Sequence, residues 1–208
     1  HSLMNDWITL INKVKAISQI GKAYTKDPFD LERYDALSRL SNEMYAKLSD
    51  APPDLVENFF IPDRGYATAK VDLRAGIVRE NSILLVKERR DGKWSLPGGW
   101  SDVGESPVEG VTREVREETG YTVGVRQLVS IRDQSLGGYS PRYPVHVYKL
   151  FFLCEILDGE ARDNVEISEI AFFPFDSLPE LSTGTTLHRD ILDIREYRCN
   201  PGKQPVCD

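Results

Sequence analysis

The segment from Pro97 to Tyr121 constrains the fold of this chain more than any other part of the sequence. Ser106-Pro107-Val108-Glu109 has the pattern of a capping box with proline at the first helical position, and Gly120 stands where a helix-ending glycine belongs. These signals predict a helix over residues 107–119. Its apolar positions recur at helical spacing and should face the core as one stripe: Val108, Val111, Val115 and Thr119.

Three glutamates, Glu114, Glu117 and Glu118, occupy a neighbouring stripe of this predicted helix. Like charges at helical spacing repel each other by a few tenths of a kcal/mol, so an isolated helix gains nothing from this arrangement. A hard divalent cation removes the conflict, because carboxylate oxygens are the ligands that Mg²⁺ and Mn²⁺ prefer. The alternative is a solvated acidic face that Arg113 and Arg116 neutralise.

The residues around the helix favour the metal site. Gly99, five residues, Glu105, seven residues and then the run from Arg113 to Tyr121 resemble the Nudix box, written G-x5-E-x7-R-E-U-x-E-E-x-G-U with U apolar. All seven singly specified positions match. Val115 fits the first apolar position, and Tyr121 stands where an aliphatic residue is usual.

This resemblance implies an α+β chain with the Nudix fold, an α/β/α sandwich around a mixed sheet, over residues 66–198. It also implies hydrolysis of the pyrophosphate bond of a nucleoside diphosphate linked to a group X, giving a nucleoside monophosphate and X-phosphate. Mg²⁺ or Mn²⁺ would be the cofactor, because an acidic site repels an anionic substrate until metal ions invert the local field.

The resemblance implies roles for individual residues of the motif as well. Divalent metals would be held by three glutamates of the helix: Glu114, Glu117 and Glu118. The carbonyl group of Gly99 is a further candidate ligand. Arg113 and Glu105 would pair and fix the preceding loop against the helix.

The motif leaves the general base open. Glu117 or Glu118 can take this role, and so can a glutamate from a later loop. In that loop Glu166 and Glu169 are the candidates, and their alternative role is the ordinary polar face of a strand start.

Candidate substrate-binding residues lie outside the motif. The loop from Asp133 to Pro144 is long and rich in Gly, Tyr, Ser and Pro, which is typical of loops that carry binding groups. Tyr139 and Tyr143 are candidates for stacking on a nucleobase, and Arg142 for pairing with phosphate, unless the loop is simply a surface loop. Further candidate phosphate contacts, each also explicable as surface charge, are Arg74, Arg79 and Arg89.

The periodicity of the chain changes near residue 62. Before it, apolar residues at three- and four-residue steps predict helices over 7–24 and 34–48 and a short helical turn over 55–59. After it, the pattern predicts a hairpin turn at Asp91-Gly92, a last helix over 187–197, and strands over 69–73, 75–78, 83–86, 121–131, 145–156 and 167–174. We therefore expect a helical domain over 4–62, a Nudix domain over 66–198 and a tail over 199–208.

The helical segment up to about Phe60 resembles the small domain that precedes certain bacterial Nudix domains. That subgroup hydrolyses nucleoside diphosphates linked to X and includes ADP-ribose and CDP-choline pyrophosphatase-like proteins, of which the CDP-choline type matches best. We expect a homodimer in which apolar faces around Trp7, Ile11 and Tyr34 are buried between subunits, with shaping of the substrate pocket as the alternative.

Composition limits the other functions. With 26 Lys and Arg against 33 Asp and Glu, the net charge is −7, which argues against broad nucleic-acid binding. Residues 1–62 carry seven basic and nine acidic side chains, so they lack the basic cluster of a DNA-binding face. An RNA-end hydrolase with a local basic channel and a non-catalytic nucleotide-sensing module remain as alternatives.

The sequence also predicts the compartment. Apolar runs such as Ile83–Val86 are too short to span a bilayer, so we expect no membrane partner. The three cysteines lack zinc-binding spacing, and no apolar leader is visible before the first helix. These features predict a cytoplasmic protein without structural zinc.

Overall fold

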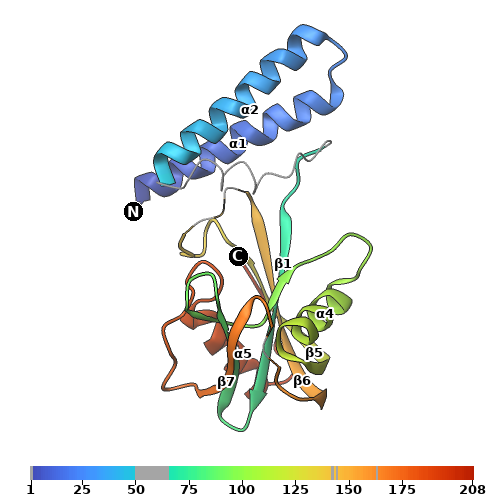
Figure 1. Cartoon of the computed structure of the whole chain (residues 1–208), viewed down its shortest axis with the longest axis vertical. Coiled ribbons are helices and arrows are strands. Elements are labelled where there is room, and N and C mark those ends of the chain that lie inside the picture. Colours follow the sequence, from blue (N-terminus) through green and yellow to red (C-terminus); the bar gives the residue numbers. More distant parts are fainter. Residues whose placement is uncertain (1, 50–65, 142, 144, 163) are drawn as a thin grey trace. The chain divides into compact units, whose positions relative to one another are not determined.

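A computed structural model describes residues 2–49, 66–141, 143, 145–162 and 164–208, and the predicted helical turn over 55–59 lies outside these ranges (Figure 1). The chain forms two compact units. The first comprises His1–Ala69 with Tyr143–His146, and the second comprises Lys70–Arg142 with Val147–Asp208. Within the described ranges, no helix combines the length and the apolar character needed to cross a membrane.

Two antiparallel helices, α1 (Ser2–Tyr24) and α2 (Pro28–Ser49), form a hairpin in the first unit (Figure 1). Its small core contains Ile8, Ile11 and Tyr45. The ring of Tyr34 lies directly on α1, because a Cβ atom added to Gly21 would be only 2.3 Å from its Cζ atom. The helices are therefore held together by the packing of this ring on Gly21 and by a few apolar contacts.

The face expected to pair two subunits differs from the prediction. Ile11 is only 5% exposed, and Tyr34 packs on Gly21, so both side chains serve the hairpin itself. Of the three predicted residues, Trp7 alone keeps a mostly exposed side chain, at 55%. Other large apolar side chains are exposed along the hairpin instead: Leu10, Ile17, Tyr24, Phe29, Leu40 and Met44.

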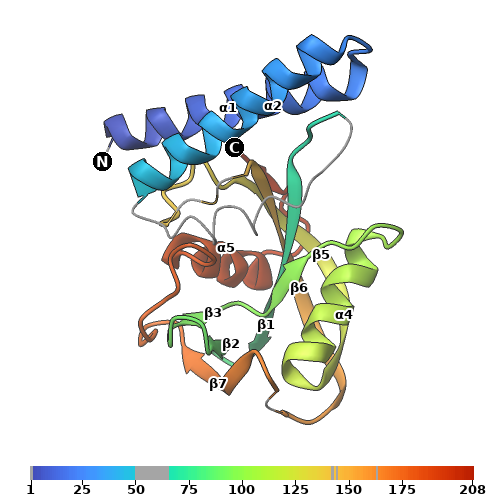
Figure 2. The same ribbon diagram turned by 45° about the horizontal axis from the view of Figure 1, so that its top comes forward.

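A mixed sheet with a helix on each face builds the second unit, which confirms the predicted α/β/α architecture. Figure 2 shows α4 (Pro107–Thr119) and α5 (His188–Cys199) on opposite sides of the sheet. The strand order is β3-β2-β1-β6-β5-β8, with β4 paired to β1 and β7 paired to β2. The strands are β1 (Lys70–Arg79), β2 (Ser82–Glu88), β3 (Trp94–Ser95), β4 (Gly98–Trp100), β5 (Tyr121–Asp133), β6 (Val147–Gly159), β7 (Ile167–Pro174) and β8 (Val206–Cys207).

The strands differ from the prediction at several places, and the sequence indicated no strand at β4. β1 is one continuous strand, where the sequence suggested two. The tail beyond residue 199 is not a plain tail, because β8 pairs in parallel with Ser130 and Ile131 of β5. Asp208 then accepts a hydrogen bond from Arg132 at 2.7 Å. Two residues of strand carry too little periodicity to be recognised, so this edge pairing depends on the position of β5.

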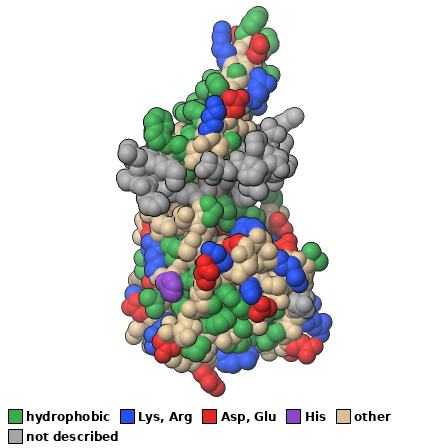
Figure 3. All heavy atoms as spheres, turned by 60° about the vertical axis from the view of Figure 1, so that its left-hand side comes forward, with side chains coloured by type: hydrophobic (Ala, Val, Ile, Leu, Met, Phe, Trp, Pro, Cys, Tyr) green, Lys and Arg blue, Asp and Glu red, His purple; other side chains and the backbone are tan. Residues whose placement is uncertain are grey.

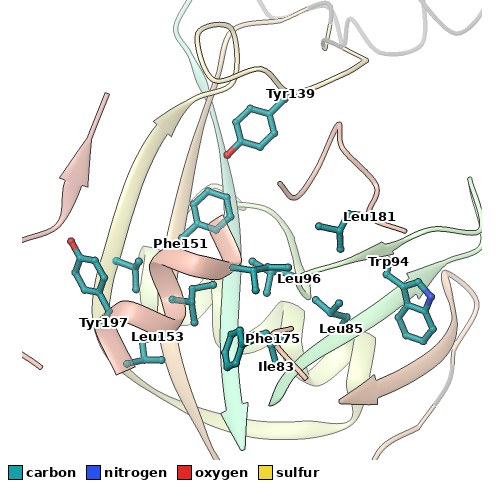
Figure 4. Packing of buried hydrophobic residues seen from close by; sticks show 13 residues of the cluster. Ile83, Leu85, Trp94, Leu96, Tyr139, Phe151, Leu153, Phe175, Leu181 and Tyr197 are labelled. Atoms are coloured by element: carbon teal, nitrogen blue, oxygen red, sulfur yellow. The ribbon is translucent and has the colours of Figure 1, made fainter. Parts of the chain in front are cut away.

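Each face of the sheet carries its own apolar core. On the α5 side, Ile191, Ile194 and Tyr197 pack against Phe151 and Leu153 of β6 among other side chains of the cluster (Figure 4).

On the α4 side, Val111 and Val115 pack against Leu73 and Ala75 of β1. Val108, which was predicted to join this stripe, is 48% exposed. Helical side chains lean toward the N-terminus of their helix, so a first-turn residue projects past the core.

Candidate active site

The sequence signals around α4 fix both ends of the helix. Ser106 and Glu109 form the predicted capping box, since Glu109 N–H donates to Ser106 Oγ at 3.2 Å and Ser106 N–H donates to Glu109 Oε2 at 2.8 Å. At the other end Gly120 adopts the left-handed conformation, with φ 79°, and its N–H donates to the carbonyl of Arg116. Fixed ends and the valine stripe together set which face of α4 the glutamates occupy.

Two of these glutamates lie directly against the backbone of β4. Gly98 N–H donates to Glu118 Oε2 at 2.7 Å. The carboxylate of Glu114 fills the place where a side chain of Gly99 would be, since an added Cβ would lie 2.8 Å from its Oε2 atom. Any other residue at position 99 would displace Glu114, so the glycine of the motif makes room for a carboxylate.

Arg113 joins three of the four glutamates of the motif into one network. Its Nε and Nη2 donate to the two carboxylate oxygens of Glu105 at 3.0 and 2.9 Å, the pairing that the motif implies. Its Nη1 donates to Glu114 at 2.9 Å and to Glu117 at 3.1 Å. Hydrogen bonds from Arg113 and from the N–H of Asp102 lower the pKa of Glu105 to about 2. Glu105 is therefore a fixed anion that ties the loop before α4 to the helix.

Glu118 and Glu114 are less well compensated than Glu105. Burial raises the pKa of Glu118 to about 8, against the opposing effects of Arg74 and the Gly98 N–H. Burial also raises the pKa of Glu114, although Arg113 opposes the shift. Two carboxylates whose ionised forms are disfavoured thus lie on adjacent turns of one helix face.

The donor chemistry of this site suits a hard divalent cation. In the described part of the chain, no three His, Cys, Asp or Glu side chains are gathered closely enough to enclose a metal ion. The available ligand atoms are all oxygens, however, and burial raises the pKa of Glu114 and of Glu118, so their ionised forms are disfavoured while no cation is bound. A divalent cation would stabilise those ionised forms, so the residues fit such a group.

The structure treats the two glutamates of the later loop differently. Glu169 pairs with Lys87 at 2.7 Å, opposite it on β2. Strand alternation puts Glu169 on the face of Ala171, which packs into the α5-side core. Glu169 therefore points away from α4. Glu166 precedes β7 in a loop that hydrogen-bonds to the end of α4 through the side chain of Asn164.

Two of the candidate substrate-binding side chains are buried. Arg74 is 7% exposed, forms an ion pair with Asp72 at 2.8 Å and donates to the carbonyl of Leu96. The positive charge of this buried guanidinium lowers the pKa of Glu118 and so partly offsets the effect of burial. Tyr139 is 2% exposed, and its ring lies in the apolar cluster drawn in Figure 4. Its hydroxyl donates to Asp190 at 2.9 Å. The prediction that Tyr139 stacks on a base is therefore wrong, because its ring belongs to the core.

The remaining candidates have varied positions. Arg89 is exposed, and its Nε donates to the carbonyl of Asn164 at 3.3 Å, so it lies beside the Glu166 loop. The guanidinium of Arg79 stacks on the ring of Phe172 at 4.4 Å. Tyr143 is partly buried and belongs to the first compact unit, and Arg142 lies outside the described residues.

Sequence reasoning missed Glu88 and Asn164. The carboxylate of Glu88 accepts hydrogen bonds from Ser95 Oγ at 2.8 Å and from Arg90 Nη2 at 2.6 Å. Its charge is close enough to raise the pKa of Glu118 further. In the sequence Glu88 stands in a run of charges that resembles an exposed strand end, so no local signal distinguishes it.

Comparisons with known proteins support both parts of the chain. Residues 72–193 match the family described as the NUDIX domain. Residues 5–60 match the family described as a UDP-X-like, N-terminal oligomerisation domain. A putative ADP-ribose pyrophosphatase of Bacillus subtilis is 37% identical over 202 residues, which is 97% of this chain and 97% of that protein.

Solved structures give the same result. The crystal structure of a UDP-X diphosphatase covers 99% of this chain and 99% of its own, with 33% identity and a TM-score of 0.64. That of an ADP-ribose pyrophosphatase from Streptococcus suis covers 68% of this chain and 100% of its own, with 38% identity and a TM-score of 0.62. With the complete motif folded as described above, the chain belongs to the Nudix hydrolase family, in the subgroup with a UDP-X-like N-terminal oligomerisation domain.

Proposed function

We propose that this protein hydrolyses the pyrophosphate bond of a nucleoside diphosphate linked to a group X, with Mg²⁺ or Mn²⁺ as cofactor. The observation that supports this most directly is the contact of Glu114 and Glu118 with the backbone of Gly98 and Gly99. Two carboxylates with raised pKa values on one side of a helix suit a cation that binds phosphate oxygens. The products are a nucleoside monophosphate and X-phosphate.

The roles of the acidic residues follow from their surroundings. Glu114, Glu117 and Glu118 would hold the cation, which when bound neutralises phosphate charge and lowers the pKa of a water molecule. Arg113 orients two of these carboxylates and holds Glu105. A water oxygen bonds to one phosphorus, and the bridging oxygen leaves with the other phosphate group. Glu166 is the loop carboxylate we assign to the proton of that water, because Glu169 is occupied by Lys87.

Several identities of X deserve a direct test. The resemblance of the N-terminal helices to those of CDP-choline pyrophosphatase-like proteins implies CDP-choline, whereas the names of similar proteins and of the matching domain point to ADP-ribose and to UDP-linked compounds. We would incubate the full chain with Mg²⁺ or Mn²⁺ and an equimolar mixture of CDP-choline, ADP-ribose, UDP-sugars, a dinucleoside polyphosphate and a short capped RNA. Mass spectrometry follows each compound.

The expected result is early loss of one small diphosphate with release of its nucleoside monophosphate, and complete inhibition by excess EDTA. Loss of the RNA alone would support the RNA-end alternative. No turnover with either metal would contradict the proposal and favour a nucleotide-sensing module.

We also propose that the α1–α2 hairpin forms a homodimer. At about 100° per residue, Trp7, Leu10, Ile17 and Tyr24 fall on one side of α1. Phe29, Leu40 and Met44 fall on one side of α2. On each helix the stripe comes just before the inner face, the one that packs on the other helix, when residues are followed in order around the helix axis. Because the two helices run antiparallel, this order turns in opposite directions when both are viewed from the same end. Both stripes therefore lie on the same side of the hairpin. Figure 3 shows exposed apolar side chains on these helices.

Light scattering at low protein concentration tests the dimer. The full chain should have the mass of two chains, and Ile17→Glu should give the mass of one, because a charge enters the apolar stripe. Leu31→Glu is the matched control, since Leu31 is 42% exposed but lies on the other side of α2. A monomeric wild-type chain, or an unchanged Ile17→Glu dimer, would contradict this interface.

A further inference from the structure

Asn164 connects two parts of the candidate active site that are far apart in the sequence. Its Nδ2 group donates to the carbonyl of Glu117 at 2.8 Å and to the carbonyl of Glu118 at 2.9 Å. Its Oδ1 atom accepts from the N–H groups of Glu166 and Ile167, each at 2.9 Å. Both N–H donors and both acceptor lone pairs of this side-chain amide are thus used.

These bonds complete the C-terminal end of α4. The last four carbonyls of a helix have no partner within it and need one elsewhere. Here the carbonyl of Arg116 accepts from Gly120, and that of Thr119 accepts from the N–H of Arg162 at 2.9 Å. The side-chain amide of Asn164 donates hydrogen bonds to the two carbonyls between them, those of Glu117 and Glu118. The turn that carries two of the candidate metal ligands is therefore held by the loop that follows β6.

The same residue organises the loop before β7. Arg89, the residue that follows β2, binds this loop. Its backbone N–H donates to the carbonyl of Glu166 at 2.9 Å, and its Nε donates to the carbonyl of Asn164 at 3.3 Å. Val165, between them, is 90% exposed and offers no packing. The position of the Glu166 backbone thus depends on hydrogen bonds, and Asn164 alone links it to α4 by a side chain among the described contacts.

We propose that Asn164 is a positioning residue for the hydrolysis, which sets the distance between the Glu117–Glu118 turn and Glu166. The inference rests on the proposed function, because it assigns the metal to that turn and the attacking water to Glu166. Groups that orient metal ligands through one further hydrogen bond typically change metal affinity or activity by roughly 10- to 100-fold when removed.

The test compares Asn164→Ala with Val165→Ala, its exposed neighbour, in the full chain. We expect Asn164→Ala to lower kcat by roughly 10- to 100-fold with KM within about threefold, and to weaken binding of Mn²⁺ alone by about tenfold. Val165→Ala should change none of these. Thermal unfolding confirms that each variant is folded, and Asn164→Ser, which keeps an oxygen for the loop N–H groups, replaces alanine if it unfolds.

A double-mutant cycle with Glu166→Gln separates positioning from general stability. If Asn164 acts through Glu166, Asn164→Ala should lower the residual kcat of Glu166→Gln by less than about threefold. Fully additive losses, or a folded Asn164→Ala with wild-type kcat and Mn²⁺ affinity, would overturn the proposal. Absence of wild-type turnover would instead refute the proposed function, and Mn²⁺ affinity would still decide whether Asn164 positions the α4 turn.

Discussion

The buried carboxylates on the two faces of the sheet differ in how many hydrogen-bond partners they have. On the α5 side, Asp190 accepts hydrogen bonds from the hydroxyl of Tyr139 and from the N–H of Leu187 at 2.8 Å, with Arg189 at 3.6 Å. On the α4 side, Glu118 accepts one hydrogen bond among the described residues, from the N–H of Gly98. A buried carboxylate with a full set of partners supports the fold, whereas one without them leaves room for a ligand.

The arginine side chains on the two faces differ in the same way. Arg132 on the α5 side pairs with Asp193 at 2.6 Å and with Asp208 at 2.7 Å, so its charge is matched within the protein. Arg113 on the α4 side is shared among several carboxylates and orients them without neutralising them all. Comparing variants on the two faces therefore distinguishes residues needed for hydrolysis from residues needed for the stability of the fold.

The largest effect is expected from Glu118→Gln. This change removes a candidate metal ligand, so kcat should fall by more than about 100-fold. The metal-free variant should be at least as stable as the wild type, because a buried carboxylate with a raised pKa is replaced by a neutral group. Steady-state kinetics and thermal unfolding with EDTA measure both quantities. Wild-type turnover would exclude Glu118 as a ligand.

Metal binding should depend on pH through the same residue. The pKa of Glu118 is raised to about 8, and only its ionised form binds a cation, so affinity for Mn²⁺ should fall by up to about tenfold per pH unit below 8. In the absence of metal, the stability of the fold depends on pH in the opposite direction from metal affinity. The stability that this group contributes is complete below its unfolded pKa and declines as pH rises through about 8.

Titration calorimetry in buffers with different ionisation enthalpies measures the proton released on Mn²⁺ binding at pH 7. Glu118→Gln is the control that should release less. Equal proton release from both proteins would assign the linked proton to another group.

Arg113→Ala should have an intermediate effect on both rate and stability. Glu105, in the loop before α4, loses its ion pair with Arg113, and Glu114 loses the donor that orients it. We expect kcat to fall about tenfold and the unfolding free energy to fall by about 1–2 kcal/mol. Arg116→Ala, on an exposed position of the same helix, is the matched control. Unchanged values in Arg113→Ala would mean that the network is not needed.

The smallest effect on the reaction is expected from Tyr139→Phe on the α5 side. Removing the hydroxyl leaves Asp190 with fewer donors in a buried site, which should cost about 1–3 kcal/mol of unfolding free energy. Turnover should stay within about threefold of the wild type. Chemical denaturation and kinetics on the same sample decide the matter, and a large loss of kcat without a loss of stability would return Tyr139 to the active site.

Much of the α4 region could be predicted because its signals are local. The capping box of Ser106 and Glu109, the left-handed Gly120 and the pairing of Arg113 with Glu105 all involve residues within one loop and one helix. Over such short separations the geometry of a helix fixes which side chains meet. The rest of the site depends on strands far apart in sequence, so residue type alone did not identify Glu88 or Asn164.

The sequence by itself determined the helix that carries the glutamates, its ends, the glycine at position 99 and the change from helices to strands near residue 62. Only the tertiary structure decided that Tyr139 is in the core, that Glu169 turns toward Lys87, and that Asn164 joins α4 to the later loop. Local hydrogen bonds and helical spacing specify the former. The latter depend on which strands pair and which face each residue occupies, and strand pairing brings together segments that no short pattern links.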